Sequence, residues 1–125
     1  MNVVDSSGWL EYLADDSNAS FFAPSIEDQV RLIVPSLSIY EVFKRVLQQR
    51  SEGEALQAVA AMQQGFVVDL STSLSLSAAR LTIDHSLPLA DSVMLATALA
   101  FEATLWTQDA DFEGLQDVRY IAKTR

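Results

Sequence analysis

Acidic side chains follow several short apolar runs in this 125-residue chain. Asp5 comes directly after Asn-Val-Val, while Asp109 and Asp111 come after Thr-Leu-Trp-Thr. Glu41 lies five residues beyond Ile-Val-Pro-Ser, and Asp91 follows Ser-Leu-Pro-Leu-Ala. Carboxylates that gather in one place repel each other unless cations lie among them. If these acids converge, the pattern is typical of phosphodiester hydrolysis, where divalent ions activate a water and stabilise the leaving oxygen.

The donor types available in the sequence favour Mg²⁺ or Mn²⁺ over zinc. The chain has no cysteine and one histidine, so thiolate metal sites and disulfides are excluded. Carboxylate oxygens are the hard ligands that Mg²⁺ and Mn²⁺ prefer. His85 lies at the end of a predicted helix, where a role at the free carbonyls is more typical than catalysis.

Each acid also has an ordinary interpretation that position alone leaves open. Asp5 precedes one predicted helix and Asp91 opens another, and capping is the default role of an aspartate at such positions. Glu41 lies opposite the apolar stripe of its helix, four residues before Arg45, a spacing typical of a surface ion pair.

Two further positions stay open in the same way. Asp109 and Asp111 form an Asp-x-Asp step, which is a common turn. Asp69 ends Phe-Val-Val and so meets the same positional criterion as Asp5.

Five short apolar runs predict the strands that must position these acids. Their continuous apolar character, rather than alternation, favours a parallel sheet covered on both faces. The predicted strands are 2–5, 32–35, 66–69, 104–106 and 118–121. In an open parallel sheet, ligands bind beyond the carboxyl ends of the strands, which is where the acids fall.

Helical patterns alternate with these runs. Apolar residues at spacings of three and four predict helices over 36–49, 54–63, 73–85 and 91–101, with another beginning near Ser7. Ser36 or Ser38 is a candidate cap for the first of the four. The alternation of strands and helices predicts an α/β fold with about five mostly parallel strands flanked by helices, in one domain over 1–125.

Composition restricts the possible functions and argues against nucleic acid as a partner. The formal charge of −9 argues against binding nucleic acid, and two divalent ions would only bring it to −5. The cations that could meet phosphate form two clusters, Lys44, Arg45 and Arg50, and Arg119, Lys123 and Arg125. The chain shows no signal-peptide pattern and no apolar run of about 18 residues, so we expect a cytoplasmic protein without a membrane partner.

Four blocks of sequence resemble a PIN domain, and more narrowly the VapC-type toxins of toxin–antitoxin pairs. The blocks are VVDSSGWLEYL, VPSLSIYEVFKRV, LPLADSVMLATALAFEATLWTQDADF and a closing VRYI. The third block is the most specific, with its Leu-Pro-x-x-Asp, small-residue helix and Thr-x-Asp-x-Asp-Phe ending. The resemblance covers nearly the whole chain and implies a three-layer α/β/α fold.

The resemblance also implies which residues carry the chemistry. The family's acidic quartet falls on Asp5, Glu41, Asp91 and Asp109, as metal ligands and catalytic residues. Asp111 is a secondary ligand candidate, either backing up the site or capping the turn, and Thr107 and Ser7 are candidates to orient substrate or water. Ser6-Ser7 departs from the Thr-Asn pair of many relatives. Asp69 matches no site position of the family.

By resemblance, the chain is expected to be a Mg²⁺- or Mn²⁺-dependent endoribonuclease toxin. Structured RNA such as tRNA or ribosomal RNA is the expected substrate, with a cognate antitoxin and a second copy of the chain as partners. Two alternatives remain: a nuclease of the same fold that acts in RNA processing or on DNA, and a non-catalytic domain that only binds a partner.

Overall fold

Five parallel strands form one sheet in the computed structural model, which describes residues 1–124. The strand order is β3-β2-β1-β4-β5, and every neighbouring pair is parallel. The strands are β1 (Asn2–Val4), β2 (Leu32–Pro35), β3 (Phe66–Val68), β4 (Thr104–Thr107) and β5 (Val118–Tyr120). The predicted parallel α/β fold is therefore confirmed.

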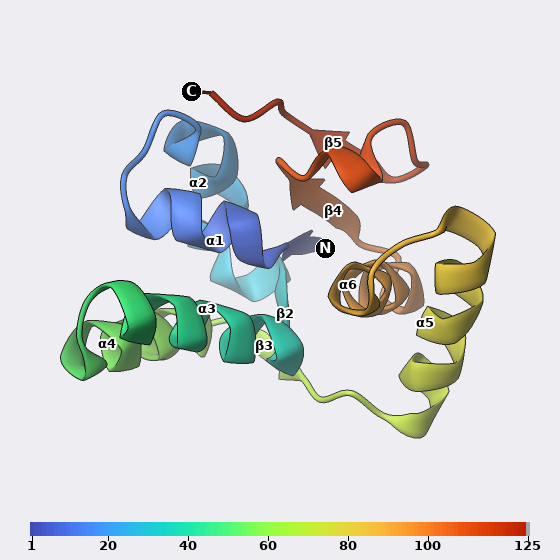
Figure 1. Ribbon diagram of the computed structural model, residues 1–125, viewed down its shortest axis with the longest axis horizontal. Helices are drawn as coiled ribbons and strands as arrows, with labels where there is room; N and C mark the ends of the chain where they lie inside the picture. Colours follow the sequence, from blue (N-terminus) through green and yellow to red (C-terminus); the bar gives the residue numbers. More distant parts are fainter. Residues whose placement is uncertain (125) are drawn as a thin grey trace.

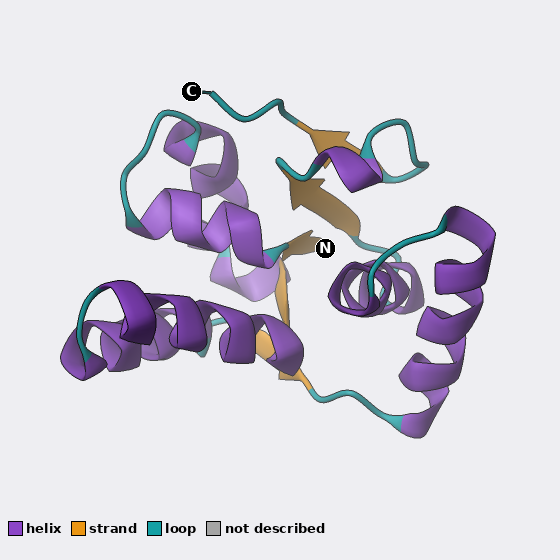
Figure 2. Cartoon of the chain, viewed as in Figure 1, coloured by secondary structure: helices purple, strands orange, loops and turns teal. Residues whose placement is uncertain are grey.

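Six α-helices and two short 3-10 helices connect the strands. They are α1 (Ser6–Leu13), α2 (Ala19–Glu27), η1 (Gln29–Arg31), α3 (Ser36–Gln49), α4 (Glu52–Met62), α5 (Thr72–His85), α6 (Leu89–Ala100) and η2 (Ala110–Phe112). Figure 1 shows α1 to α4 on one side of the sheet and α6 on the other, with α5 outside α6. The three layers, with strands between helices, are coloured by type in Figure 2.

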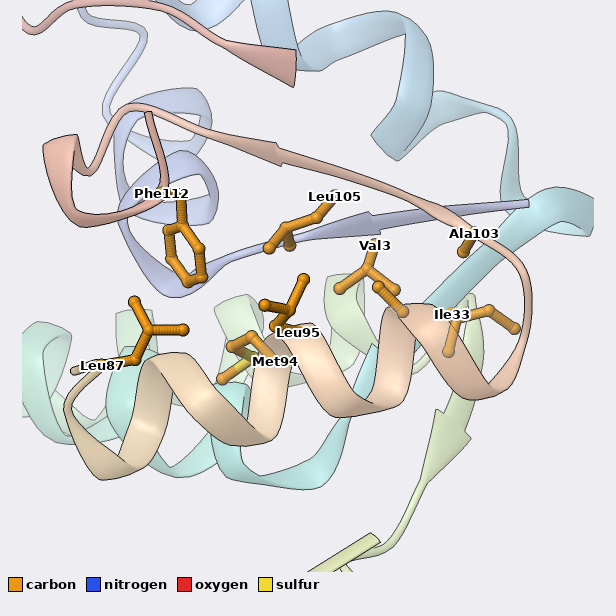
Figure 3. Close-up of a cluster of buried hydrophobic side chains, with 9 residues drawn as sticks. Val3, Ile33, Leu87, Met94, Leu95, Ala103, Leu105 and Phe112 are labelled. Carbon is orange, nitrogen blue, oxygen red and sulfur yellow. The ribbon is translucent and has the colours of Figure 1, made fainter. Parts of the chain in front are cut away.

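Successive residues of the central strand β1 point into two different cores, as the pleat requires. Val3 packs with α6 in one apolar cluster, and Val4 packs with Trp9 and Phe22 in the other. Figure 3 shows the first cluster between α6 and the sheet, with Phe112 directed toward Leu87 and Met94. Burial on both faces explains why the strands read as continuous apolar runs.

The chain order creates a switch point between β1 and β4. From β1 the chain crosses through α1 and α2 to β2, whereas β4 is reached from β3 through α5 and α6 on the opposite face. The loops that leave the carboxyl ends of β1 and β4 therefore diverge to opposite faces. In α/β sheets, this divergence leaves a crevice in which ligands bind.

The structure corrects the predicted helices in two places. Residues 19–27 form α2, which the sequence did not predict because Pro24 removes a helical N–H donor from its interior. Neither Ser36 nor Ser38 caps α3: Pro35 occupies the cap position, and Ser38 Oγ donates to the Pro35 carbonyl at 2.6 Å. The other predicted helices begin and end within two residues of the observed ones.

Gly8 allows the close approach of α1 to the core, and we predict that Gly8→Ala destabilises the protein. A Cβ at this position would lie 2.6 Å from Phe22 Cε1 and 2.7 Å from Val4 Cγ1. We expect overpacking to cost about 1–3 kcal/mol of unfolding free energy. Urea unfolding measures this. The control is Gly53→Ala in α4, where the new methyl would contact only Ser51 Oγ, at 3.9 Å, and should stabilise the helix by about 0.5–1 kcal/mol.

Candidate metal centre

A hollow of about 240 Å³ lies at the carboxyl edge of the sheet, at the switch point. Side chains from the residue that follows β1, from α1, α3 and α6, and from the loop after β4 surround it. It is lined by Asp5, Ser6, Ser7, Leu10, Glu41, Lys44, Arg45, Asp91, Met94 and Asp109. Four acids singled out in the sequence, Asp5, Glu41, Asp91 and Asp109, thus share one cavity although they are far apart along the chain.

Asp5 is the most buried acid of the hollow and also the cap of α1. Its Oδ1 accepts hydrogen bonds from Ser7 Oγ at 2.8 Å and Gly8 N at 2.9 Å, and its Oδ2 accepts one from Thr107 Oγ1 at 2.6 Å. A carboxylate offers about four lone-pair positions, so one remains on Oδ2 for a cation. The capping and site interpretations of Asp5 are therefore compatible.

Burial and hydrogen bonding act in opposite directions on the pKa of Asp5. Burial disfavours the charged form and raises the pKa of this carboxyl, with the nearby Asp109 acting in the same direction. The bonds from Thr107, Gly8 and Ser7 favour the anion and oppose that rise, but burial prevails. A cation in the hollow would relieve this cost directly.

Thr107 connects the two acids that follow neighbouring strands. Its hydroxyl donates to Asp5 Oδ2 at 2.6 Å and accepts from the Asp109 N–H at 2.9 Å. Asp109 Oδ1 in turn accepts from Asp111 N at 3.0 Å and caps η2. Asp109 itself, rather than Asp111, therefore caps this turn, which corrects one of the two roles considered for Asp111.

Asp91 lies in the first turn of α6 but does not cap it. Pro88 occupies the cap position, so α6 begins at Leu89 and its third residue, Asp91, faces the hollow. Burial raises the pKa of Asp91 to about 8, helped by the charge and hydrogen bond of Asp109 and the charges of Asp5 and Asp111. The default capping interpretation of Asp91 is wrong.

Asp111 belongs to the same acidic group although it is exposed. Carboxylate oxygens of Asp91, Asp109 and Asp111 lie within 4.8 Å of one another, a spacing that one metal ion can bridge. Phe112, the next residue, is fully buried and holds the loop against α6. Phe112 thus anchors the acidic loop in the apolar core.

Glu41 reaches the hollow from α3 and is paired with a hydroxyl. Ser6 Oγ donates to Glu41 Oε1 at 2.6 Å, whereas within residues 1–124 no ion pair joins Glu41 to Arg45. Arg45 and Lys44 instead line the hollow. Ser6 was noted in the sequence only as a departure from relatives, because a partner 35 positions away leaves no local pattern.

Asp69 lies apart from the other acids. It is exposed and follows β3, the edge strand, two strands away from β1. In the sequence, Asp69 and Asp5 are equivalent because each directly follows a short apolar strand. In the fold they are separated because β2 lies between β3 and β1. Gln108, by contrast, was missed as a candidate, although it is 6% exposed and bonded to α1 and to Asn18.

The donor set of the hollow fits a hard divalent cation. Its candidate ligands are carboxylates, the donors that Mg²⁺ and Mn²⁺ prefer, and no cysteine or histidine of residues 1–124 lines it. Burial first, and the neighbouring carboxylates second, raise the pKa of Asp5 and of Asp91, so the ionised carboxylates are unfavourable in the hollow without a further cation. A bound cation would supply the missing positive charge.

This architecture, a parallel sheet between helices with acids converging at the switch point, defines a class of α/β proteins with an acidic edge. A sequence profile described as the PIN domain matches residues 3–117. The chain therefore belongs to the PIN domain family.

Solved structures of similar fold include several toxins. A toxin–antitoxin complex from Klebsiella pneumoniae aligns with a TM-score of 0.80 at 18% identity, covering 95% of this chain and 96% of that one. VapC20 from Mycobacterium tuberculosis, described as a sarcin-ricin loop cleaving toxin, aligns at 0.78 and 19%, covering 95% and 99%. DNA-bound VapBC from Salmonella typhimurium aligns at 0.72 and 12%, covering 97% and 96%. A search of curated proteins by sequence found no significant match. At these identities, the structural matches establish the fold.

None of the helices over residues 1–124 is long and apolar enough to cross a membrane.

Proposed function

We propose that this chain is a metal-dependent endoribonuclease and the toxin of a toxin–antitoxin pair, cleaving structured RNA such as tRNA or ribosomal RNA. The observation that carries the proposal is the convergence of Asp5, Glu41, Asp91 and Asp109 on one hollow at the switch point. Family membership supports it, and so do the similar folds of proteins described as toxins. An intact quartet disfavours a domain that only binds a partner.

In this proposal the four acids hold Mg²⁺ or Mn²⁺, with Asp111 as a further ligand from the rim. When bound, the cation supplies positive charge that activates water and stabilises the leaving oxygen. The hydrogen bonds from Thr107, Ser7 and the Gly8 N–H fix the orientation of Asp5, and Ser6 orients Glu41. Keeping the ligands rigid reduces the reorganisation needed when substrate arrives.

Lys44 and Arg45 give this acidic protein a local phosphate contact. Both are exposed and line the same hollow as the acids, whereas the overall charge is −9. A single-stranded RNA loop can be bound through a few groups around the cleavage site, without an extensive basic face. The local arrangement of charge therefore supports RNA binding better than the net charge does.

Two observations bear on the proposed partners. Leu76 and Ile83, two turns apart on α5, are 60% and 81% exposed, and Leu89 at the start of α6 is 74% exposed. This apolar surface lies on the helix layer farthest from α1 and supports a homodimer. The toxin–antitoxin and VapBC descriptions of proteins with similar fold support a cognate antitoxin.

Cleavage of labelled total RNA by the purified chain tests the proposal. We expect discrete cuts with Mg²⁺ or Mn²⁺ and none with EDTA, and the cut sites identify the RNA. Asp69→Asn, which removes an exposed acid from outside the hollow, should cleave like the wild type. Cleavage of DNA but not RNA, or cleavage unaffected by EDTA, would contradict the proposed activity. Folded protein that neither cleaves RNA nor binds Mn²⁺ would indicate a partner-binding domain.

A further inference from the structure

Three polar side chains join the loop after β4 to α1 and to the start of α2. Gln108 Nε2 donates to the Ser7 carbonyl at 3.3 Å and to Glu11 Oε1 at 3.1 Å. Asn18 Nδ2 donates to Gln108 Oε1 at 3.0 Å and to the Ala122 carbonyl at 3.0 Å. Asn18 N donates to Glu11 Oε2 at 2.9 Å. All four N–H donors of the two amides are thus used.

This network is buried, so its bonds constrain geometry more than surface bonds do. Gln108 is 6% exposed and Asn18 is 5% exposed, while Glu11 is half-buried. Buried amides left without partners would cost about 1–3 kcal/mol each, which holds the network closed.

The network is connected to the candidate metal ligands on both sides. Gln108 stands between Thr107, which donates to Asp5, and Asp109. Its partner Ser7 also contacts Asp5, through Oγ at 2.8 Å. Two connections therefore run between Asp5 and the 107–109 segment, one through Thr107 and one through Gln108 and Ser7. Two connections restrict the relative position of two groups more than one does.

We propose that Gln108, held by Glu11 and Asn18, is a positioning residue that sets the placement of Asp109 relative to Asp5. The inference rests on the proposed metal-dependent function, because the two acids are ligands only in that case. Gln108 contacts neither acid side chain, so it acts through Ser7 and through the backbone of its neighbours. Its loss should loosen the metal site while leaving Lys44 and Arg45, the proposed phosphate contacts, in place.

Gln108→Leu is the first test, since it keeps the bulk of the side chain and removes all its hydrogen bonds. We expect Mn²⁺ affinity, measured by calorimetry, to fall about tenfold, as for other groups that orient metal ligands. With RNA as substrate, kcat should fall by a similar factor and KM should change little. A purely structural role would lower the melting temperature without these effects.

Asn2→Ala is the matched control. Asn2 Oδ1 accepts from Trp106 Nε1 at 2.8 Å and so also joins the β1 segment to β4, but at the amino edge of the sheet. It should lower the melting temperature while keeping Mn²⁺ affinity and kcat. Equal Mn²⁺ affinity and kcat in the two variants, with wild type active, would overturn the positioning role alone.

Exchanging the amide and the acid provides a rescue. Gln108→Glu places two carboxylates at the 3.1 Å contact and should impair Mn²⁺ binding at least as much as Gln108→Leu. Adding Glu11→Gln restores a donor–acceptor pair at this contact but leaves the Ser7 carbonyl without its donor, so it should recover part of the affinity. A double variant no better than Gln108→Glu would contradict the proposal. Wild-type protein that binds no Mn²⁺ and cleaves no RNA would instead overturn the proposed function, and this inference with it.

Discussion

Asp91→Asn is expected to lower RNA cleavage by about a thousandfold while making the metal-free protein more stable. Asparagine keeps the shape of the side chain but offers a metal ion no negative charge, and loss of one group that stabilises developing charge typically costs a factor of this order. Burial and the neighbouring carboxylates raise the pKa of Asp91 to about 8, so the ionised form is unfavourable in the folded state. At neutral pH folding must therefore be accompanied by proton uptake at Asp91, and asparagine, which removes that cost, should stabilise the fold.

The opposite directions of the two effects make the result diagnostic. After discounting for solvent around a half-buried side chain, we expect a gain of about 2 kcal/mol at neutral pH without metal. Single-turnover cleavage and urea unfolding in EDTA measure the two quantities. Asp69→Asn should change neither. If Asp91→Asn lowers both stability and cleavage, Asp91 has a structural role; if it cleaves within tenfold of wild type, Asp91 is not a required ligand.

Asp5 and Asp109 were predictable because a simple rule connects sequence position to spatial position. Both follow short apolar strands, and the carboxyl ends of parallel strands lie at one edge of the sheet. The same rule also selected Asp69 as a candidate site residue, although it follows an edge strand. Strand order, which depends on how crossovers pack and not on any local pattern, decides which of these acids meet.

Two errors in the sequence-based predictions, the cap of α6 and the missed helix α2, have local causes. Pro88 and Asp91 both favour a helix start, and the fixed φ of proline placed the cap at Pro88. Asp91 was thereby moved into the helix and toward the hollow. Pro24 made a helix at this position appear unfavourable from the sequence. The helix forms because the burial of Phe22 and Ile26 in the folded chain offsets the local penalty of the proline.

The Gln108 network was beyond prediction for a different reason. Its bonds connect residues 90, 97 and 101 positions apart, and a lone glutamine in a loop carries no periodicity. Acidic residues can be recognised in a sequence as candidate metal ligands, whereas the amide side chains that position them cannot. Contacts of this kind are found only once the fold is known.

The stability of the metal-free protein is expected to fall as pH rises from about 4 to about 8. An aspartate titrates near 3.8 when unfolded, whereas burial and neighbouring carboxylates raise the pKa of Asp91 to about 8 in the folded protein. Between these values the folded state binds more protons than the unfolded state, so raising the pH favours unfolding. Burial also raises the pKa of Asp5, which acts in the same direction.

Divalent metal should reverse this dependence, because a cation binds the deprotonated acids and competes with protons. Urea unfolding at about pH 5, 6.5 and 8 measures it, first with EDTA and then with excess Mg²⁺. Saturating metal at a hundred times its dissociation constant would add about 2.7 kcal/mol, most strongly at high pH. Asp91→Asn should flatten the EDTA series and reduce the gain from Mg²⁺. A wild-type protein whose stability in EDTA rises steadily over this range would show that the acids of the hollow are already compensated, and the case for a cation there would fail.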